Sequence, residues 1–151
     1  MTIKVLYHSV TGNTQQIAEA ISDELDCPIV HSNAGPHPIR ADVLFIGGAC
    51  YNEGNLHPIH ADLIREIEAL NPEHIGTSVV FSTGFPRLST AIAQICELLE
   101  KRGIPVYEKH FFCRGKFMIF NRRRPNQRDL QLSRDFARLA IEQLNRSAVS
   151  S

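Results

Sequence analysis

The stretch VLYHSVTGNT, residues 5–14, carries the clearest structural signal in the chain. Its first half continues a run of branched and aromatic residues that begins at Ile3, which is typical of a β-strand. Small hydroxyl-bearing residues and one glycine follow, and apolar residues then recur at helical spacing from Ile17 onward. The stretch therefore predicts a strand over residues 3–7, a short polar loop, and a helix over residues 14–25.

The alternation of strand and helix continues along the chain. The run VLFI at residues 43–46 is typical of a strand that is buried on both faces of a parallel sheet. Further strands are expected at residues 28–30, 43–46, 79–81 and 106–112, and further helices at 59–70, 88–102 and after residue 126. The apolar positions expected to face inward are Leu63, Ile67 and Leu70, then Ile92, Ile95, Cys96 and Leu99, and finally Leu132, Phe136, Leu139 and Ala140. Five strands alternating with four helices indicate an α/β fold around a parallel sheet.

Length and composition indicate one globular domain. The chain has 151 residues, 43% of them apolar and 21% charged, which argues against disorder. We expect a single domain over residues 1–147 and a short tail over 148–151. No apolar run is long enough for a membrane span and no signal peptide is recognisable, so we expect a cytoplasmic protein without a membrane partner. The four cysteines lack metal-ligand spacing, which predicts free thiols and no metal site.

The zero net charge conceals an asymmetry between the two parts of the chain. Residues 1–100 carry 4 basic and 12 acidic side chains, a net charge of −8, whereas residues 101–151 carry 12 basic and 4 acidic ones, a net charge of +8. Folding could interleave the two parts into one mixed surface. Alternatively, basic residues around 114–128 form a patch that steers an acidic partner. The sequence contains no nucleic-acid-binding motif, so nucleic acid is not the expected partner.

The loop after the first strand has the chemistry of a phosphate site. Hydroxyl and amide side chains can donate hydrogen bonds, glycine lets backbone N–H groups turn inward, and the following helix begins with unpaired N–H groups. The loop contains no lysine or arginine and matches neither the P-loop nor the dinucleotide fingerprint. The alternative is that these residues only cap the helix. The candidate phosphate-binding residues are Ser9, Val10, Thr11, Gly12, Asn13 and Thr14.

Residues 5–14, together with the helix residues 17–21, resemble the signature of the flavodoxin family. In that family the loop Ser/Thr-x-Thr-Gly-x-Thr holds the phosphate of FMN. The resemblance implies a flavodoxin-like fold, a three-layer sandwich around a five-stranded parallel sheet of order 2-1-3-4-5. It also implies non-covalent binding of FMN.

Two further loops at the carboxyl ends of expected strands would complete a flavin site. The resemblance implies that Tyr51 stacks on the flavin ring, with the peptide between Asn52 and Glu53 beside flavin N5; Tyr51 could instead be an ordinary loop aromatic. Phe85 could cover the second face, although this loop is shorter and less acidic than is usual in the family. The candidate flavin-binding residues here are Gly48, Ala49, Cys50, Tyr51, Asn52, Glu53, Gly54, Ser82, Thr83, Gly84 and Phe85.

Three functions remain open on the sequence alone. The leading hypothesis is an FMN-dependent electron carrier between redox partner proteins that are not identified. The second is an FMN-dependent reductase of a small molecule such as a quinone, or an accessory to a dedicated reductase, and the third is a cofactor-free binding module. No catalytic residue is assigned, since a hydrolase elbow is absent. The oligomeric state and the role of residues 113–124 stay open.

Overall fold

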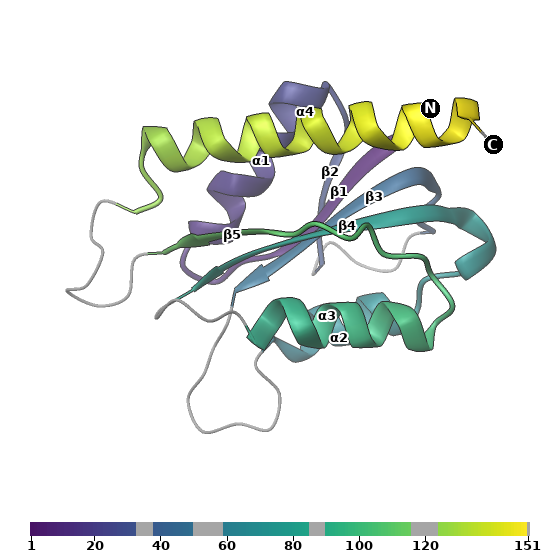
Figure 1. The fold of residues 1–151 in the computed structure, drawn as a ribbon. Helices are drawn as coiled ribbons and strands as arrows, with labels where there is room; N and C mark the ends of the chain where they lie inside the picture. Colours follow the sequence, from purple (N-terminus) through teal and green to yellow (C-terminus); the bar gives the residue numbers. More distant parts are fainter. Residues whose placement is uncertain (33–37, 50–58, 85–89, 116–123, 151) are drawn as a thin grey trace.

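The computed structural model describes residues 1–32, 38–49, 59–84, 90–115 and 124–150 (Figure 1). The strands are β1 (Ile3–His8), β2 (Ile29–His31), β3 (Ala41–Ala49), β4 (Ile75–Gly84) and β5 (Phe111–Arg114). The helices are α1 (Asn13–Leu25), α2 (Ala61–Glu68), α3 (Thr90–Lys101) and α4 (Gln127–Ser150), and a 3₁₀ turn, η1, covers Pro72–His74. The strands form one parallel five-stranded sheet of order β2-β1-β3-β4-β5, which confirms the predicted topology.

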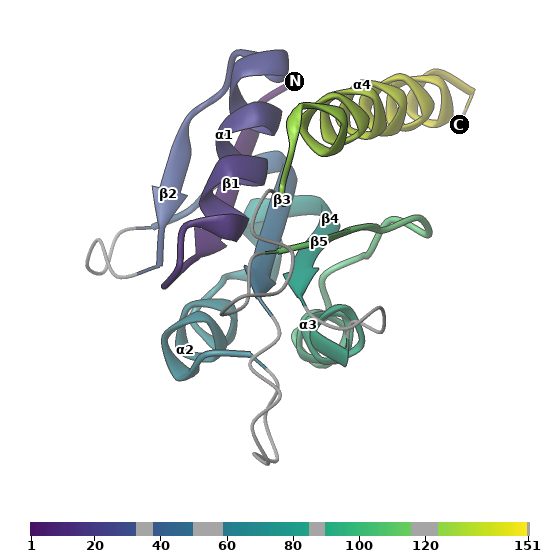
Figure 2. The ribbon, with the colours of Figure 1, turned by 90° about the vertical axis from the view of Figure 1, so that its left-hand side faces the viewer.

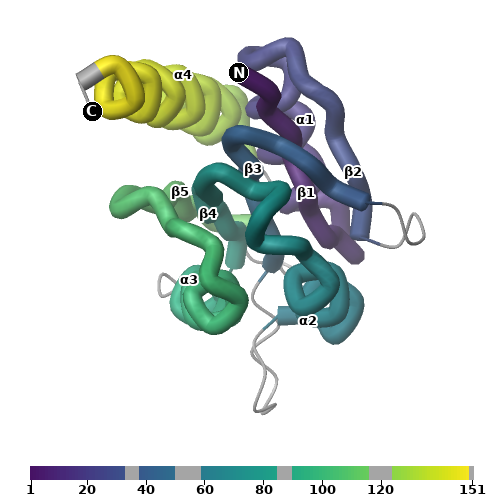
Figure 3. Tube along the Cα trace, turned by 90° about the vertical axis from the view of Figure 1, so that its right-hand side faces the viewer, coloured from purple at the N-terminus to yellow at the C-terminus, as the bar shows by residue number. Residues whose placement is uncertain are grey.

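Two helix layers cover the two faces of this sheet. Figure 2 shows α1 and α4 on one face and α2 and α3 on the other, and Figure 3 shows the same layers from the opposite side. Because side chains alternate along a strand, Val5 and Tyr7 of β1 pack toward α1 and α4, whereas Leu6 packs toward α2 and α3. The predicted three-layer sandwich is confirmed. The same alternation directs His8, the last residue of β1, toward α2.

The fifth strand differs from its prediction over residues 106–112. Pairing with β4 begins at an isolated bridge between Ser78 and Val106 and then breaks off before β5 starts at Phe111. The residues between, Glu-Lys-His at 108–110, are exposed. β5 lies at the edge of the sheet, where a strand needs a partner on one side only, so polar residues can leave the ladder locally.

The buried face of α4 also differs from its prediction. Ala140 is buried as expected, but Leu132 and Leu139 are 47% and 51% exposed. Small residues, Ser133, Ala137 and Ala140, line the inner face instead. Since α4 packs against α1, small side chains let the two helices approach closely. Helical spacing predicted an apolar stripe on α4, but it could not show which face of the helix packs against α1 and the sheet.

No helix in the described parts of the chain has both the length and the apolarity that a bilayer span requires.

Three cysteines, Cys27, Cys96 and Cys113, are free thiols. Burial, assisted by the negative charge of Asp129, raises the pKa of Cys113 to about 12. The Cys113 thiol therefore stays protonated at neutral pH, which favours a packing role over a reactive one.

Candidate functional site

The carboxyl ends of β1, β3 and β4 lie side by side and form the carboxyl edge of the sheet. This edge runs across the strands and differs from the lateral edge that β5 forms. In the register of these strands His8 pairs with Gly48, Gly48 with Ser82, and Ala49 with Thr83. The first-loop candidates and the residues Gly48, Ala49, Ser82, Thr83 and Gly84 are therefore brought to the same edge, as predicted for loops that follow parallel strands. The remaining candidates lie outside the described residues: Cys50, Tyr51, Asn52, Glu53, Gly54 and Phe85.

The loop between β1 and α1 is shaped by its own short contacts. The Gly12 amide donates a hydrogen bond to Ser9 Oγ over 3.0 Å, which closes a tight turn. Gly12 has φ +90°, a left-handed conformation that glycine adopts without strain, and it stands at the N-cap of α1. Gly12 offers no side chain that could cap the helix, and both Val10 and Thr11 are exposed. The exposed loop thus lies at the positive end of the α1 dipole, while Asn13 and Thr14 at the start of the helix are buried.

Other candidate hydroxyls make contacts inside the protein. The hydroxyls of Thr14 and Thr83 are hydrogen-bonded over 2.8 Å, and both residues are fully buried. Ser82 Oγ donates to the Gly48 carbonyl over 2.7 Å. These bonds connect α1 to β4, and β4 to β3, directly beneath the loop. Thr14 and Ser82 therefore use their hydroxyls to connect neighbouring elements at the carboxyl edge. Thr11, in contrast, is exposed.

The donor set of this loop fits a phosphate monoester. Residues 9–14 carry no charged side chain, so the helix dipole is the local source of positive potential. An added Cβ at Gly115, just after β5, would lie 2.5 Å from Asn13 Nδ2, so this glycine lets the end of β5 approach the loop closely. Exposed Thr11, the turn at Gly12 and the positive end of the α1 dipole together form a surface on which oxygen acceptors can bind.

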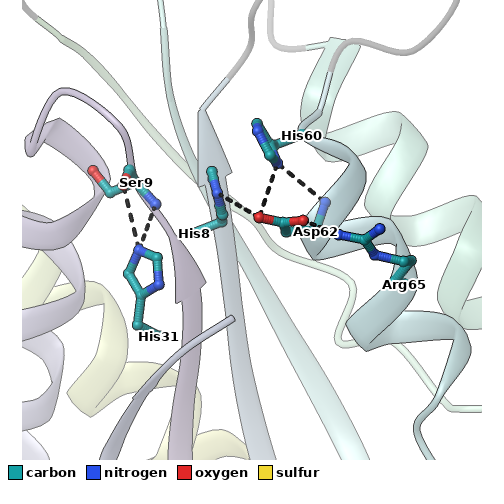
Figure 4. Close-up of polar contacts among 6 residues, drawn as sticks. All are labelled: His8, Ser9, His31, His60, Asp62 and Arg65. Atoms are coloured by element: carbon teal, nitrogen blue, oxygen red, sulfur yellow. Dashed lines mark hydrogen bonds and ion pairs between the residues drawn. The ribbon is translucent and has the colours of Figure 1, made fainter. Parts of the chain in front are cut away.

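A cluster of ionisable side chains lies next to this loop, on the α2 side of the sheet (Figure 4). His60 is the N-cap of α2, where its Nδ1 accepts the Asp62 N–H over 3.1 Å. Asp62 Oδ2 lies 3.6 Å from His60 Nδ1 and 3.8 Å from His8 Nε2, and Arg65 contacts the other carboxylate oxygen. The His8 and His60 rings are stacked, with centroids 4.1 Å apart.

His31 from β2 lies beside the carboxyl end of β1, on the side away from His60 and Asp62. Its Nε2 is 3.4 Å from the Ser9 backbone nitrogen and 3.3 Å from the Ser9 carbonyl oxygen. The imidazole thereby connects β2 to the first residue of the loop. Sequence reasoning missed this grouping because the four residues His8, His31, His60 and Asp62 come from three separate segments. The one signal in the sequence that points to this grouping is the position of His8 at the carboxyl end of a predicted strand.

Acid is expected to destabilise the protein through His8. Burial, assisted by His60 and His31, lowers the pKa of His8 to about 4, whereas Asp62 acts in the opposite direction. The unfolded chain, with a histidine pKa of about 6.5, binds more protons between these two values. Stability should therefore fall by about 2–3 kcal/mol as the pH drops from 7 to 4 because of this residue.

Urea unfolding at pH 7, 5.5 and 4, with a chelator present, measures this effect. In His8→Asn the loss of stability between pH 7 and 4 should be smaller than in the parent by about 2 kcal/mol. His110→Gln, which changes an exposed histidine, should keep the parent's pH dependence. An unaltered pH dependence in His8→Asn would contradict the assignment.

Comparison with known proteins finds similarity in structure alone. No family model matches the chain, and no curated protein matches it. Oxidised flavodoxin 2 from Bacillus cereus superposes with a TM-score of 0.72 and 19% identity, covering 95% of this chain and 99% of that one. The flavodoxin, WrbA-like protein from Agrobacterium tumefaciens gives 0.66 and 15%, covering 93% and 98%. Rubredoxin oxygen:oxidoreductase from the anaerobe Desulfovibrio gigas gives 0.68 and 16%, covering 95% of this chain and 36% of that one.

Proposed function

Because the chain has a flavodoxin-like fold, we propose that it binds FMN non-covalently and carries electrons between redox partners. The observation that carries the proposal is the loop between β1 and α1. It combines an exposed threonine, Thr11, a glycine turn and the N-terminus of a helix whose N-cap is a glycine, at the carboxyl edge of a parallel sheet. This is where ligands of open α/β sheets bind, and the donors present suit a phosphate.

Each part of the loop has a distinct role in binding the phosphate. The bond from the Gly12 amide to Ser9 Oγ sets the loop geometry before ligand arrives, which lowers the entropy cost of binding. The N–H groups of the first turn of α1 and the Thr11 hydroxyl then donate to phosphate oxygens. Attraction between the phosphate and the helix dipole contributes about 0.3–1 kcal/mol to the free energy of binding, and up to about 2 kcal/mol where the site is partly buried.

The buried contacts beneath the loop keep this edge rigid. The Thr14–Thr83 hydrogen bond fixes the start of α1 against β4, and Ser82 fixes β4 against β3. Ligand-binding loops on rigid strands are positioned more accurately than free loops. When bound, FMN supplies one- and two-electron transfer, while the protein supplies position and electrostatics. The net charge of +8 over residues 101–151 favours an acidic redox partner.

The visible spectrum of the protein purified without additives tests this function. We expect the absorption bands of a bound oxidised flavin, or their appearance in a bound form after FMN is added to the colourless protein. NAD(P)H alone should reduce the flavin slowly, and a catalytic amount of a flavoprotein reductase should accelerate its reduction.

Two results would contradict the proposal. Fast reduction by NAD(P)H without a partner would indicate a reductase rather than a carrier. A colourless protein that does not change the spectrum or fluorescence of added FMN would indicate a binding module without cofactor.

A further inference from the structure

Two imidazoles and one carboxylate converge between the end of β1 and the start of α2 (Figure 4). One ligand atom from each of His8, His60 and Asp62 lies within 4.8 Å of the other two. None of these three residues belongs to the loop that is proposed to hold phosphate. The convergence therefore calls for an explanation of its own.

His8 is the least satisfied member of this cluster. The residue is only 4% exposed, and its Nδ1 has no hydrogen-bond partner among the residues that the structure describes. Its Nε2 points at Asp62 Oδ2 from 3.8 Å, which is beyond hydrogen-bond distance. A buried polar group left without a partner costs about 1–3 kcal/mol. The Nε2 atom therefore faces Asp62 Oδ2 across a distance that leaves a position for a further atom bound to both.

The two oxygens of Asp62 have different surroundings. Arg65 contacts Oδ1 from the next turn of α2, whereas Oδ2 faces both imidazoles, at 3.6 Å from His60 and 3.8 Å from His8. Outer contacts of this kind orient the carboxylates that bind metal ions. Arg65 thus turns one oxygen outward and leaves the other for the centre of the cluster.

We propose that His8, His60 and Asp62 form a binding site for a divalent transition cation of the zinc type. Two imidazoles and a carboxylate suit zinc, cobalt, nickel and ferrous iron, whereas magnesium and calcium prefer oxygen ligands alone. Three protein ligands leave at least one coordination position for water or another exogenous ligand. The site lies beside the loop that is proposed to bind phosphate, but its test requires no flavin.

The distances in the cluster are close to those of a metal site. Zinc binds nitrogen and oxygen ligands at about 2.0–2.1 Å, which places neighbouring ligand atoms of a tetrahedron about 3.3 Å apart. The contacts of Asp62 Oδ2 at 3.6 and 3.8 Å must shorten by a few tenths of an ångström, and any separation near the 4.8 Å limit of the cluster must shorten by more. The larger movement belongs to His60, whose ring is stacked on His8 and whose Nδ1 caps α2. The His60 side chain is 40% exposed, so it is less enclosed than that of His8, which is 5% exposed.

Metal titrations of the tag-free protein, after chelator treatment and dialysis, test the site. Cobalt should produce visible absorption bands, and calorimetry with zinc should show one ion bound per chain. His60→Ala and Asp62→Asn should each weaken zinc binding by at least about 30-fold, since each removes one of three ligands. His74→Ala, a histidine on η1 that contacts Arg40, is the matched control and should bind zinc like the parent. Magnesium should not compete with zinc.

Amide and imidazole NMR spectra provide a second readout that locates the ion. Zinc should shift the Asp62 amide, because turning His60 breaks the hydrogen bond to that amide, and it should shift the His8 ring signals. The variants on α2 carry the test, since His8 is buried and its replacement could disturb the fold.

Three outcomes would overturn the proposal. They are the absence of cobalt bands and zinc heat, zinc binding that survives both α2 variants, and an equal loss in His74→Ala. The flavin spectrum of the same samples is an independent result, so failure of the metal site and failure of the proposed function can be told apart.

Discussion

The flavin-free protein is expected to bind FMN about 100-fold more tightly than riboflavin, a difference of about 2.7 kcal/mol. The two ligands share the isoalloxazine ring and the ribityl chain and differ only in the phosphate. The phosphate is the group that the loop between β1 and α1 is proposed to hold, through Thr11 and the helix start. One hydrogen bond to a charged group contributes about 1.5–3 kcal/mol, so one or two such bonds account for the ratio.

Fluorescence titration of the parent and of two threonine variants measures this difference. Thr11→Val keeps the shape of the side chain but removes its hydroxyl, and it should weaken FMN binding about tenfold while riboflavin binding stays unchanged. Thr77→Val removes a hydroxyl that donates to the Pro105 carbonyl, far from the carboxyl end of β4, and should affect neither ligand. Equal affinities for FMN and riboflavin in the parent would show that the loop does not bind phosphate.

Gly47→Ala should lower the free energy of unfolding by about 3 kcal/mol, the upper end of the usual cost of overpacking. An added Cβ at this position would lie 2.0 Å from Cε2 and 2.2 Å from Cζ of Phe81. Phe81 is fully buried between the sheet and the α1/α4 layer, so its ring has little room to withdraw. Gly48→Ala, on the opposite face, would meet the end of the Leu63 side chain at 2.6 Å. That side-chain end can rotate, so we expect a loss nearer 1 kcal/mol.

A double-mutant cycle measured by urea unfolding checks the cause. Phe81→Leu removes ring atoms that the new methyl group would meet, so the loss in the double variant should be smaller than the sum of the single losses by at least about 1 kcal/mol. Additive losses would mean that Gly47 is required for another reason. Gly48 is also one of the candidate flavin-binding residues, and the structure gives both glycines a packing role.

The α/β architecture could be predicted because its signals are local. Strand runs of branched residues, helical spacing and glycine punctuation, such as Gly103 with φ +77° after α3, all act within a few residues. The predictions were wrong where burial or strand pairing depends on a neighbouring element. Leu132 and Leu139 are on the exposed side of α4 because small residues face α1, and pairing between Val106 and Phe111 breaks off because that strand lies at an edge.

Residues 3–25 form their strand, polar loop and helix from local sequence signals, and these elements define the carboxyl edge of the sheet where a ligand can bind. Which side chains share that edge depends instead on how the elements pack together. The strand order places β2 and β3 on either side of β1, and α2 covers one face, so His31, His60 and Asp62 gather around His8 and the loop start. The physical reason is that chain propensities are local, whereas a cluster of ionisable groups depends on how distant segments pack.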